Sequence, residues 1–214
     1  MKSPIAVIVC VSALLFPALA QADSPLADAI EKQDQGAFRE LLEKQTDVNV
    51  AQVDGMTALH WAAHHDDLEA ARQLLKAGAQ ANAKNRYGVT PLYSACQNGS
   101  GKMVELILDA GASANATFSE DETALMIAAR TGKPDAVRVL LAKGAKVDAI
   151  GPRKQTALMW AAAEGNLEVV KLLIDAKANL HAKLKSGFTP LMFAVRNGKH
   201  EVVHLLIELS LIHI

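Results

Sequence analysis

The strongest constraint on the fold of this chain is a seven-residue motif that returns at a fixed interval. The motif starts with threonine, continues with Ala-Leu or Pro-Leu, and carries alanine at its sixth position. It occupies residues 57–63, 90–96, 123–129, 156–162 and 189–195, so successive copies start 33 residues apart. A constant step of this size predicts stacked copies of one supersecondary unit instead of one globular core.

The same interval positions the signals that begin and end helices. The threonine suits a helix N-cap, and the alanine or proline after it suits the first helical position. Apolar residues at i, i+3 and i+4 spacing then predict a longer second helix. Glycines suited to left-handed C-caps follow the first helix (Gly99, Gly132, Gly165 and Gly198) and the second helix (Gly78, Gly111 and Gly144).

These features resemble the ankyrin repeat. The match is carried by Gly88-Val-Thr-Pro-Leu92, by Gly165-Asn-Leu-Glu-Val-Val-Lys-Leu-Leu173 and by Ala77-Gly-Ala-Gln-Ala-Asn-Ala83, and the resemblance covers about residues 24–208. It implies an all-α repeat fold, an ankyrin-repeat solenoid of stacked helix-turn-helix units joined by β-turn or hairpin loops.

The register divides the chain into a signal peptide at 1–22 and an ankyrin-repeat domain at 23–208. We expect an N-capping repeat at 23–51, full repeats at 52–84, 85–117, 118–150 and 151–183, and a partial repeat at 184–208. The first helix of the N-capping repeat is polar, as a repeat with an unstacked face requires. Its polar residues are Asp28, Glu31, Lys32, Asp34 and Gln35.

Residues 1–22 have the features of a cleavable signal peptide. Lys2 supplies a positive start, and residues 5–16 form an apolar stretch that is too short to span a bilayer. We expect cleavage after Ala22, with cleavage after Ala20 and an uncleaved membrane anchor as the alternatives. The expected location is periplasmic or secreted, with no stable membrane anchor after cleavage.

Four positions depart from the glycine pattern. Asp121 and Lys154 replace the glycine of the turn, Asp66 replaces the glycine after a first helix, and Lys177 replaces the glycine after a second helix. A residue other than glycine at positive φ costs on the order of 1 kcal/mol, which an array stabilised by its neighbours tolerates.

The last repeat has an apolar surface where a further repeat is expected to stack. We expect Val202, Val203, Leu206 and Ile207 on that surface, with no polar cap after them. The hexapeptide 209–214 is also the translation of a common transposase sequencing adaptor. We therefore expect a non-native tail at 209–214 and further repeats in the native sequence.

Cys96 is the only cysteine left once the signal peptide is removed. It stands where other copies have alanine, so we interpret it as a small core residue instead of a redox thiol. The net charge of −1, with no basic run and no basic stripe with interleaved aromatic residues, argues against a nucleic-acid partner.

His60, His64 and His65 form the sharpest candidate for a chemical site. Histidines at i and i+4 share a helix face and can ligate zinc. The preferred interpretation is structural, because His60 occupies the family's histidine position beside Thr57 and no third ligand is placed by the sequence. No nucleophile elbow, phosphate loop or dinucleotide motif is present, so we expect no enzyme activity and no cofactor.

Trp61, Trp160 and Phe193 share one repeat position. Their rings are expected either to pack in the core or to line the concave face.

The resemblance also implies where a partner binds, namely on the concave face made by the turn tips and the exposed ends of the first helices. We expect Arg86 and Tyr87 to contribute most, because arginine and tyrosine are enriched at binding hot spots. By position, the candidate residues are Asp54, Met56, His64, His65, Arg86, Tyr87, Val89, Gln97, Asn98, Glu120, Glu122, Arg130, Arg153, Gln155, Glu164, Lys185, Phe188 and Arg196.

The resulting functional hypothesis is a non-catalytic, monomeric scaffold or adaptor in the bacterial cell envelope. It would bind a protein partner, as an accessory or chaperone-like factor for an envelope enzyme. The first alternative is an inhibitor or immunity protein against a toxin. The alternative of another class is a metal-dependent enzyme at the His60/His64/His65 cluster.

Overall fold

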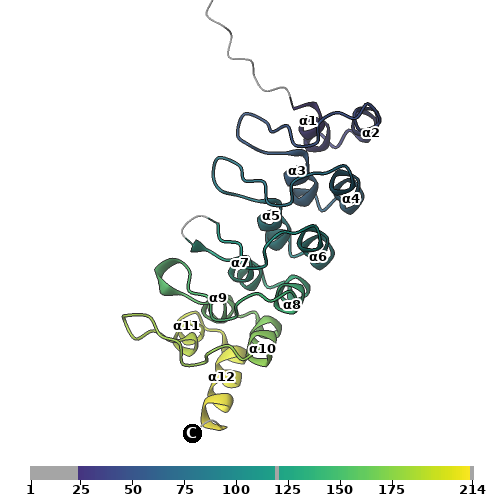
Figure 1. Ribbon diagram of the computed structural model, residues 1–214. Helices are drawn as coiled ribbons and strands as arrows, with labels where there is room; N and C mark the ends of the chain where they lie inside the picture. Colours follow the sequence, from purple (N-terminus) through teal and green to yellow (C-terminus); the bar gives the residue numbers. More distant parts are fainter. Residues whose placement is uncertain (1–23, 119–120, 213–214) are drawn as a thin grey trace, which may run out of the picture.

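The computed structural model describes residues 24–118 and 121–212. Within these ranges the chain forms twelve α-helices and one short 3-10 turn, and its only β feature is an isolated bridge between Thr117 and Thr123. The helices follow one another in pairs and form an elongated stack, with the loops on one side (Figure 1). The predicted all-α repeat solenoid is therefore confirmed. The predicted signal peptide lies outside the described residues.

Each pair consists of a first helix that starts at the recurring motif and a second helix that packs against it. The first helices are α1 (Pro25–Glu31), α3 (Ala58–His64), α5 (Pro91–Asn98), α7 (Ala124–Thr131), α9 (Ala157–Glu164) and α11 (Pro190–Arg196). The second helices are α2 (Gln35–Glu43), α4 (Leu68–Lys76), α6 (Gly101–Asp109), α8 (Pro134–Ala142), α10 (Leu167–Asp175) and α12 (His200–Ile212).

The predicted helix caps are present. Thr90, Thr123, Thr156 and Thr189 each accept a hydrogen bond from the backbone N–H three residues later through their hydroxyl oxygen. Gly99, Gly132 and Gly165 cap α5, α7 and α9 in the left-handed conformation. The non-glycine residues expected at positive φ adopt it, with φ of 56° at Asp66, 64° at Asp121, 63° at Lys154 and 69° at Lys177.

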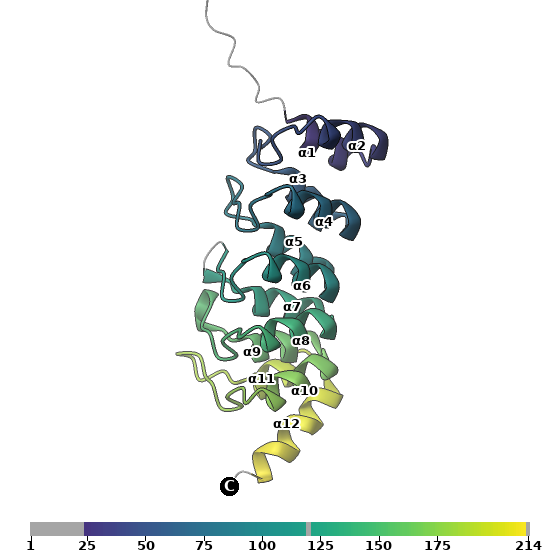
Figure 2. The same cartoon turned by 45° about the vertical axis from the view of Figure 1, so that its right-hand side comes forward.

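The turns before the first helices share one hydrogen-bonding scheme. The first residue of each turn donates its N–H to the carbonyl oxygen four residues later, for example Asn85 to Val89 at 3.0 Å and Leu184 to Phe188 at 2.9 Å. These turns occupy residues 52–56, 85–89, 118–122, 151–155 and 184–188. The described parts of these turns project from the same side of the stack in both views (Figure 2).

Successive repeats are joined through both helix layers. Each first helix contacts the first helices before and after it, and α4, α6, α8, α10 and α12 contact one another in the same order. The core is a continuous band of small and medium apolar side chains, including Ala62, Leu92, Ala129 and Leu158, all at most 1% exposed. Among the described residues, no helix is long and apolar enough to cross a membrane.

Asparagine side chains add hydrogen bonds between repeats. Asn49, Asn82 and Asn115 each donate through Nδ2 to the carbonyl oxygen of the glycine that follows the next second helix, at 3.0–3.1 Å. Because that glycine carbonyl comes at the end of a helix and has no partner within it, the side chain satisfies it from the preceding repeat. A second set, Asn98, Asn166 and Asn197, bonds back to carbonyl oxygens at the end of the preceding first helix.

The last repeat has an apolar end surface, but not the one that the sequence predicted. The prediction is wrong for Val202 and Leu206, because each is 1% exposed and packs into the core. Of the four expected residues, Ile207 is exposed at 42% and Val203 is half-buried. The main exposed residues are instead Met192 at 48% and Val195 at 58%, whose counterparts Met159 and Ala162 are buried beneath the following repeat.

Candidate functional site

His60 belongs to the scaffold. It is fully buried, its Nδ1 accepts a hydrogen bond from the Thr57 N–H at 3.1 Å, and Nδ1 lies 2.8 Å from Thr57 Oγ1. Since Nδ1 is an acceptor, the ring proton is on Nε2, which donates to the Val89 carbonyl oxygen in the next repeat at 3.0 Å. Burial lowers the pKa of His60 below 6.5 and outweighs the hydrogen bond to Val89 and the charge of Asp54. The structural interpretation of His60 is confirmed.

The metal-site alternative is not supported by this geometry. Both ring nitrogens of His60 are used in hydrogen bonds, so it is not free to ligate a metal. Over residues 24–118 and 121–212, there is no group of three or more His, Cys, Asp or Glu side chains placed to hold a metal ion. His64 and His65 instead pack on the Trp61 ring, with centroid distances of 5.7 Å and 5.9 Å.

Cys96 is a core residue, as expected. It is 0% exposed, and burial raises the pKa of its thiol well above the usual range. A buried thiol held in its protonated form is a poor nucleophile and a poor metal ligand.

Most of the predicted partner-binding residues lie on one surface, which we call the turn/first-helix face. It consists of the five turns defined above and the sides and C-terminal ends of the first helices that follow them. The exposed candidates are His64, Arg86, Tyr87, Gln97, Asn98, Arg153, Glu164, Lys185 and Arg196. The half-buried candidates are Asp54, Met56, His65, Val89, Glu122, Arg130 and Phe188.

Several candidates differ from the expectation. Gln155 is only 9% exposed, so its side chain does not contribute to the surface. Asn98 donates to the carbonyl oxygens of Ala63 and His64, which gives it a structural role between repeats. The Asp54 carboxylate accepts a hydrogen bond from the Met56 N–H within its own turn. Glu120 lies outside the described residues.

The structure adds contacts between arginine and aromatic side chains that sequence reasoning missed. The Arg130 guanidinium lies 5.4 Å from the centroid of the Trp160 ring in the next repeat, and it also pairs with Glu122 at 3.3 Å. Arg196 lies 5.4 Å from the Phe188 ring and 5.2 Å from the Phe193 ring. A guanidinium in contact with an aromatic face can still donate its N–H groups to a carboxylate. Trp61 and Trp160 are half-buried and Phe193 is buried, so the rings both pack and line this face.

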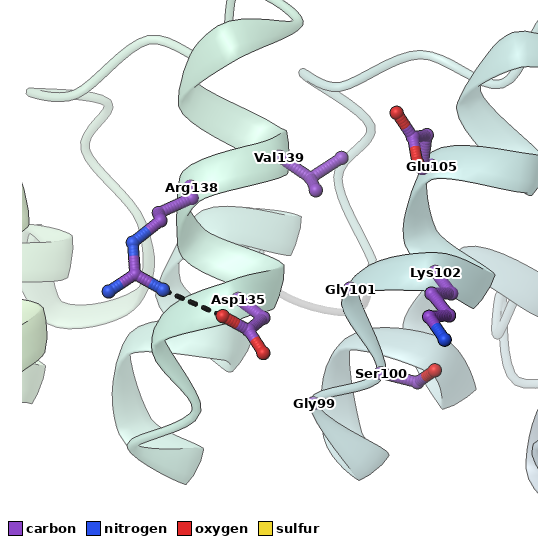
Figure 3. A pocket seen from close by; sticks show the side chains of 8 residues that line it. All are labelled: Gly99, Ser100, Gly101, Lys102, Glu105, Asp135, Arg138 and Val139. Atoms are coloured by element: carbon purple, nitrogen blue, oxygen red, sulfur yellow. Dashed lines mark hydrogen bonds and ion pairs between the residues drawn. The ribbon is translucent and has the colours of Figure 1, made fainter.

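The opposite side of the stack, formed by the second helices, has a separate pocket. It measures about 450 Å³ and lies between α6 and α8, with Gly101, Lys102, Glu105, Asp135 and Arg138 in its lining (Figure 3). Its charges are of both signs and its polar groups do not converge on one point, so no ligand class is indicated.

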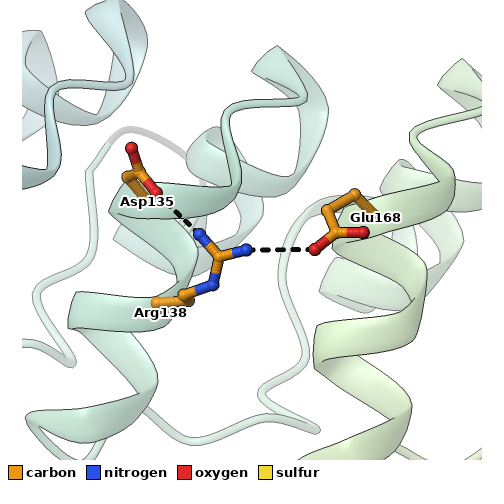
Figure 4. A network of polar contacts seen from close by, with 3 residues as sticks. All are labelled: Asp135, Arg138 and Glu168. Atoms are coloured by element: carbon orange, nitrogen blue, oxygen red, sulfur yellow. Dashed lines mark hydrogen bonds and ion pairs between the residues drawn. The ribbon is translucent and has the colours of Figure 1, made fainter.

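Arg138 at the edge of this pocket also joins two repeats. It pairs with Asp135 in its own helix at 2.6 Å and with Glu168 of the next repeat at 3.0 Å (Figure 4). These side chains are largely exposed to solvent, so the pairs contribute little to stability.

Comparison with known families agrees with the geometry of the repeats. The family model described as ankyrin repeats (3 copies) matches residues 10–85, 26–118, 80–151 and 125–213. The chain is an ankyrin-repeat protein. No curated protein matches its sequence significantly. Ankyrin repeats generally mediate protein–protein interaction, so membership of the family indicates a protein partner for this ankyrin-repeat protein.

Proposed function

We propose that this ankyrin-repeat protein is a non-catalytic, monomeric scaffold or adaptor of the bacterial cell envelope. Its partner is a protein, and it acts as an accessory or chaperone-like factor for an envelope enzyme. The observation that carries the proposal is the turn/first-helix face, where Tyr87 is 73% exposed at the tip of its turn beside the exposed Arg86. An exposed tyrosine and arginine on a fixed turn are the side chains that dominate protein interfaces.

The turn that carries Tyr87 is well fixed. The Asn85 carboxamide oxygen accepts hydrogen bonds from the N–H groups of Tyr87 and Val89, both at 2.9 Å. Arg86 donates its backbone N–H to the Asp54 carbonyl oxygen in the preceding turn, also at 2.9 Å. A surface held in this way loses little conformational entropy on binding, which favours affinity.

The binding role is tested by affinity capture from a periplasmic extract. The mature protein is immobilised next to the double variant Arg86→Ala plus Tyr87→Ala, and next to Arg72→Ala as a control. Arg72 is exposed on α4, away from this face. We expect a partner that is retained by the wild type and by Arg72→Ala and lost by the double variant. Equal retention by all three proteins would show that binding does not use Arg86 and Tyr87.

The proposed location rests on residues 1–22, which have the composition of a signal peptide. Expression of the full chain in a bacterium, followed by periplasmic fractionation and N-terminal sequencing, tests it. The expected product is periplasmic and begins at Asp23. A cytoplasmic product that begins at Met1 would contradict export.

A further inference from the structure

Charge is distributed unevenly along the turn/first-helix face. The turn before α9 carries Arg153 and Lys154, and Lys183 and Lys185 lie at the turn before α11, all four exposed. No aspartate or glutamate occurs in residues 149–163 or 176–200, and the exposed carboxylate of Glu164 lies on this face at the end of α9. The turn at 118–122, by contrast, is acidic. The last two repeats therefore present basic side chains on a molecule whose net charge is −1.

Two arginines lie on the first helices on either side of α9. Arg130 on α7 and Arg196 on α11 occupy the same repeat position, and the residue between them in the series is Ala163 on α9. Both guanidinium groups lie against aromatic rings, as described above. Within the described residues Arg196 forms no ion pair, and its Nε donates only a long hydrogen bond, of 3.5 Å, to Asn197 Oδ1. A guanidinium oriented in this way is suited to bind a carboxylate through two N–H groups.

Two polar atoms at the start of α9 have no hydrogen-bond partner among the described residues. They are Trp160 Nε1, a donor, and Gln155 Oε1, an acceptor. The equivalent Trp61 Nε1 donates to Gln52 Oε1 at 2.7 Å, but the residue corresponding to Gln52 is Gly151, which has no side chain. Trp160 is half-buried, so a rotation of its ring on binding would let Nε1 donate to a carbonyl oxygen of a bound polypeptide, whereas the buried Gln155 side chain does not reach the surface.

We propose that the turn/first-helix face from α7 to α11 binds an extended, acidic polypeptide segment whose carboxylates pair with Arg130 and Arg196. This inference rests on the proposed protein-binding function and assigns the chemistry of the partner. Packed helices lie about 8–10 Å apart, so arginines two helices apart are about 16–20 Å from each other. An extended chain rises about 3.3 Å per residue, which places the two acidic residues about five or six positions apart.

The charge pattern favours a polypeptide over nucleic acid or an anionic membrane. Glu122 lies 3.3 Å from Arg130, and Asp121 is exposed in the same turn. A phosphate backbone presents negative charge at every nucleotide and would meet these carboxylates as well as the arginines. A peptide whose carboxylates are spaced to reach the two arginines can pass the Asp121 and Glu122 carboxylates with an uncharged segment.

The test uses fluorescein-labelled synthetic peptides and the mature protein, with binding read by fluorescence anisotropy. The first peptide is a Gly/Ser chain with one tyrosine and two glutamates about six residues apart. The second has the same composition with adjacent glutamates, and the third has glutamine in place of glutamate. We expect the spaced peptide to bind about tenfold more tightly than the adjacent one and the glutamine peptide to bind weakest.

The protein variants locate the binding. Arg130→Gln and Arg196→Gln are each expected to weaken the spaced peptide about tenfold, whereas Arg138→Gln on the second helices leaves its affinity unchanged. Urea unfolding of each variant shows whether the fold is retained. If Arg130→Gln proves unstable, the test rests on Arg196→Gln, which breaks no ion pair among the described residues.

Three results would overturn the inference. They are no saturable binding of the spaced peptide up to about 1 mM, equal binding of all three peptides, and tighter binding of a single-stranded oligonucleotide or of phosphatidylglycerol vesicles. The inference can also fail while the proposed function stands. A captured protein partner that is lost on Arg86→Ala plus Tyr87→Ala but retained on Arg130→Gln plus Arg196→Gln would preserve protein binding and exclude the acidic segment.

Discussion

At the residue scale, one repeat position accepts very different side chains. It holds His60, Tyr93, Met126, Met159 and Met192 in successive repeats. His60 is fully buried and bonds to the next repeat, whereas Met126 and Met159 fill the same place by packing alone. Histidine at this position adds hydrogen bonds but requires the imidazole to stay neutral. The junction between the repeats of His60 and Val89 is therefore sensitive to pH.

The first prediction concerns that sensitivity. The pKa of His60 is lowered in the folded protein from its ordinary 6.5, so the unfolded chain binds the proton more tightly. The contribution of His60 to stability is therefore full above about pH 6.5 and is lost as the pH falls through its lowered pKa. We expect the urea midpoint to drop between about pH 7.5 and about pH 5, and to drop less in His60→Met. Acidic residues titrate alike in both proteins and cancel in the comparison.

His64→Ala is the matched control for this experiment, because His64 is exposed. Its pH profile is expected to follow that of the wild type. At neutral pH, His60→Met is expected to lose about 1 kcal/mol, the usual net contribution of a hydrogen bond. Superimposable pH profiles for His60→Met and the wild type would contradict a buried, neutral imidazole.

The second prediction concerns Cys96. Because the thiol is 0% exposed and its pKa is raised by burial, a thiol reagent such as Ellman's reagent should not label the folded mature protein and should label it fully in denaturant. Cys96→Ala is expected to cost about 1 kcal/mol or less, since Ala63, Ala129 and Ala162 occupy the same place. Rapid labelling of the native protein would show that the thiol is accessible.

At the scale of the elements, helix ends determine how the repeats are built. The second residue after each of the helices α2, α4, α6, α8 and α10 has positive φ whether it is glycine, as at Gly144 with 84°, or lysine, as at Lys177 with 69°. Position in the repeat, not residue type, therefore dictates the backbone. The backbone of the repeat at 151–183 is strained at Lys177. Packing of α10 against α8 and α12 offsets the free-energy cost of that strain.

The third prediction follows from this strain. Lys177→Gly should raise the free energy of unfolding by about 1 kcal/mol, because glycine adopts the left-handed conformation without the Cβ penalty. Gly144→Ala should lower it by about the same amount, since an added Cβ meets nothing within 4 Å and only the backbone cost remains. Chemical denaturation of both variants measures the two effects. A loss of stability in Lys177→Gly would mean that the lysine side chain matters more than the backbone.

At the scale of the whole molecule, each repeat interacts with its immediate neighbours. Stability is then a sum of repeat and interface contributions, and a terminal repeat lacks one interface. The exposed Met192 and Val195 are the direct result, because their counterparts Met159 and Ala162 are covered by the next repeat.

The fourth prediction compares the same repeat position in an inner repeat, at Ala162, and in the last repeat, at Val195. Ala162→Glu should prevent folding or destabilise strongly, since Ala162 is 0% exposed and a buried unpaired charge costs several kcal/mol. Val195→Glu at the equivalent position, 58% exposed, should change stability by only about 0.5 kcal/mol. Thermal unfolding followed by circular dichroism distinguishes the two. Comparable damage from both would indicate that Val195 is covered in solution, by a second copy or otherwise.

How far the sequence predicts this molecule depends on the range of the interaction. Caps and turn conformations are local. The recurring motif therefore predicts the helix cap at Thr123, and the regular spacing of the glycines predicts the positive φ of Lys177. The contact of Arg130 with Trp160 depends on two side chains in different repeats, and the periodicity that aligns the backbones does not specify rotamers. Gln155 shows the same limit, because its position in the turn predicted exposure while its side chain is buried beside α9.

The asparagine bonds between repeats have a consequence for how this protein can change in size. Asn115 satisfies a glycine carbonyl in the following repeat just as Asn82 and Asn49 do, so every junction of this type is chemically alike. Deleting residues 85–117 would bring Asn82 opposite Gly144, with the same partner and spacing. Repeats joined by these bonds can therefore be gained or lost as whole units. Evolution can lengthen or shorten the recognition surface by one repeat at a time while the same contacts join the repeats.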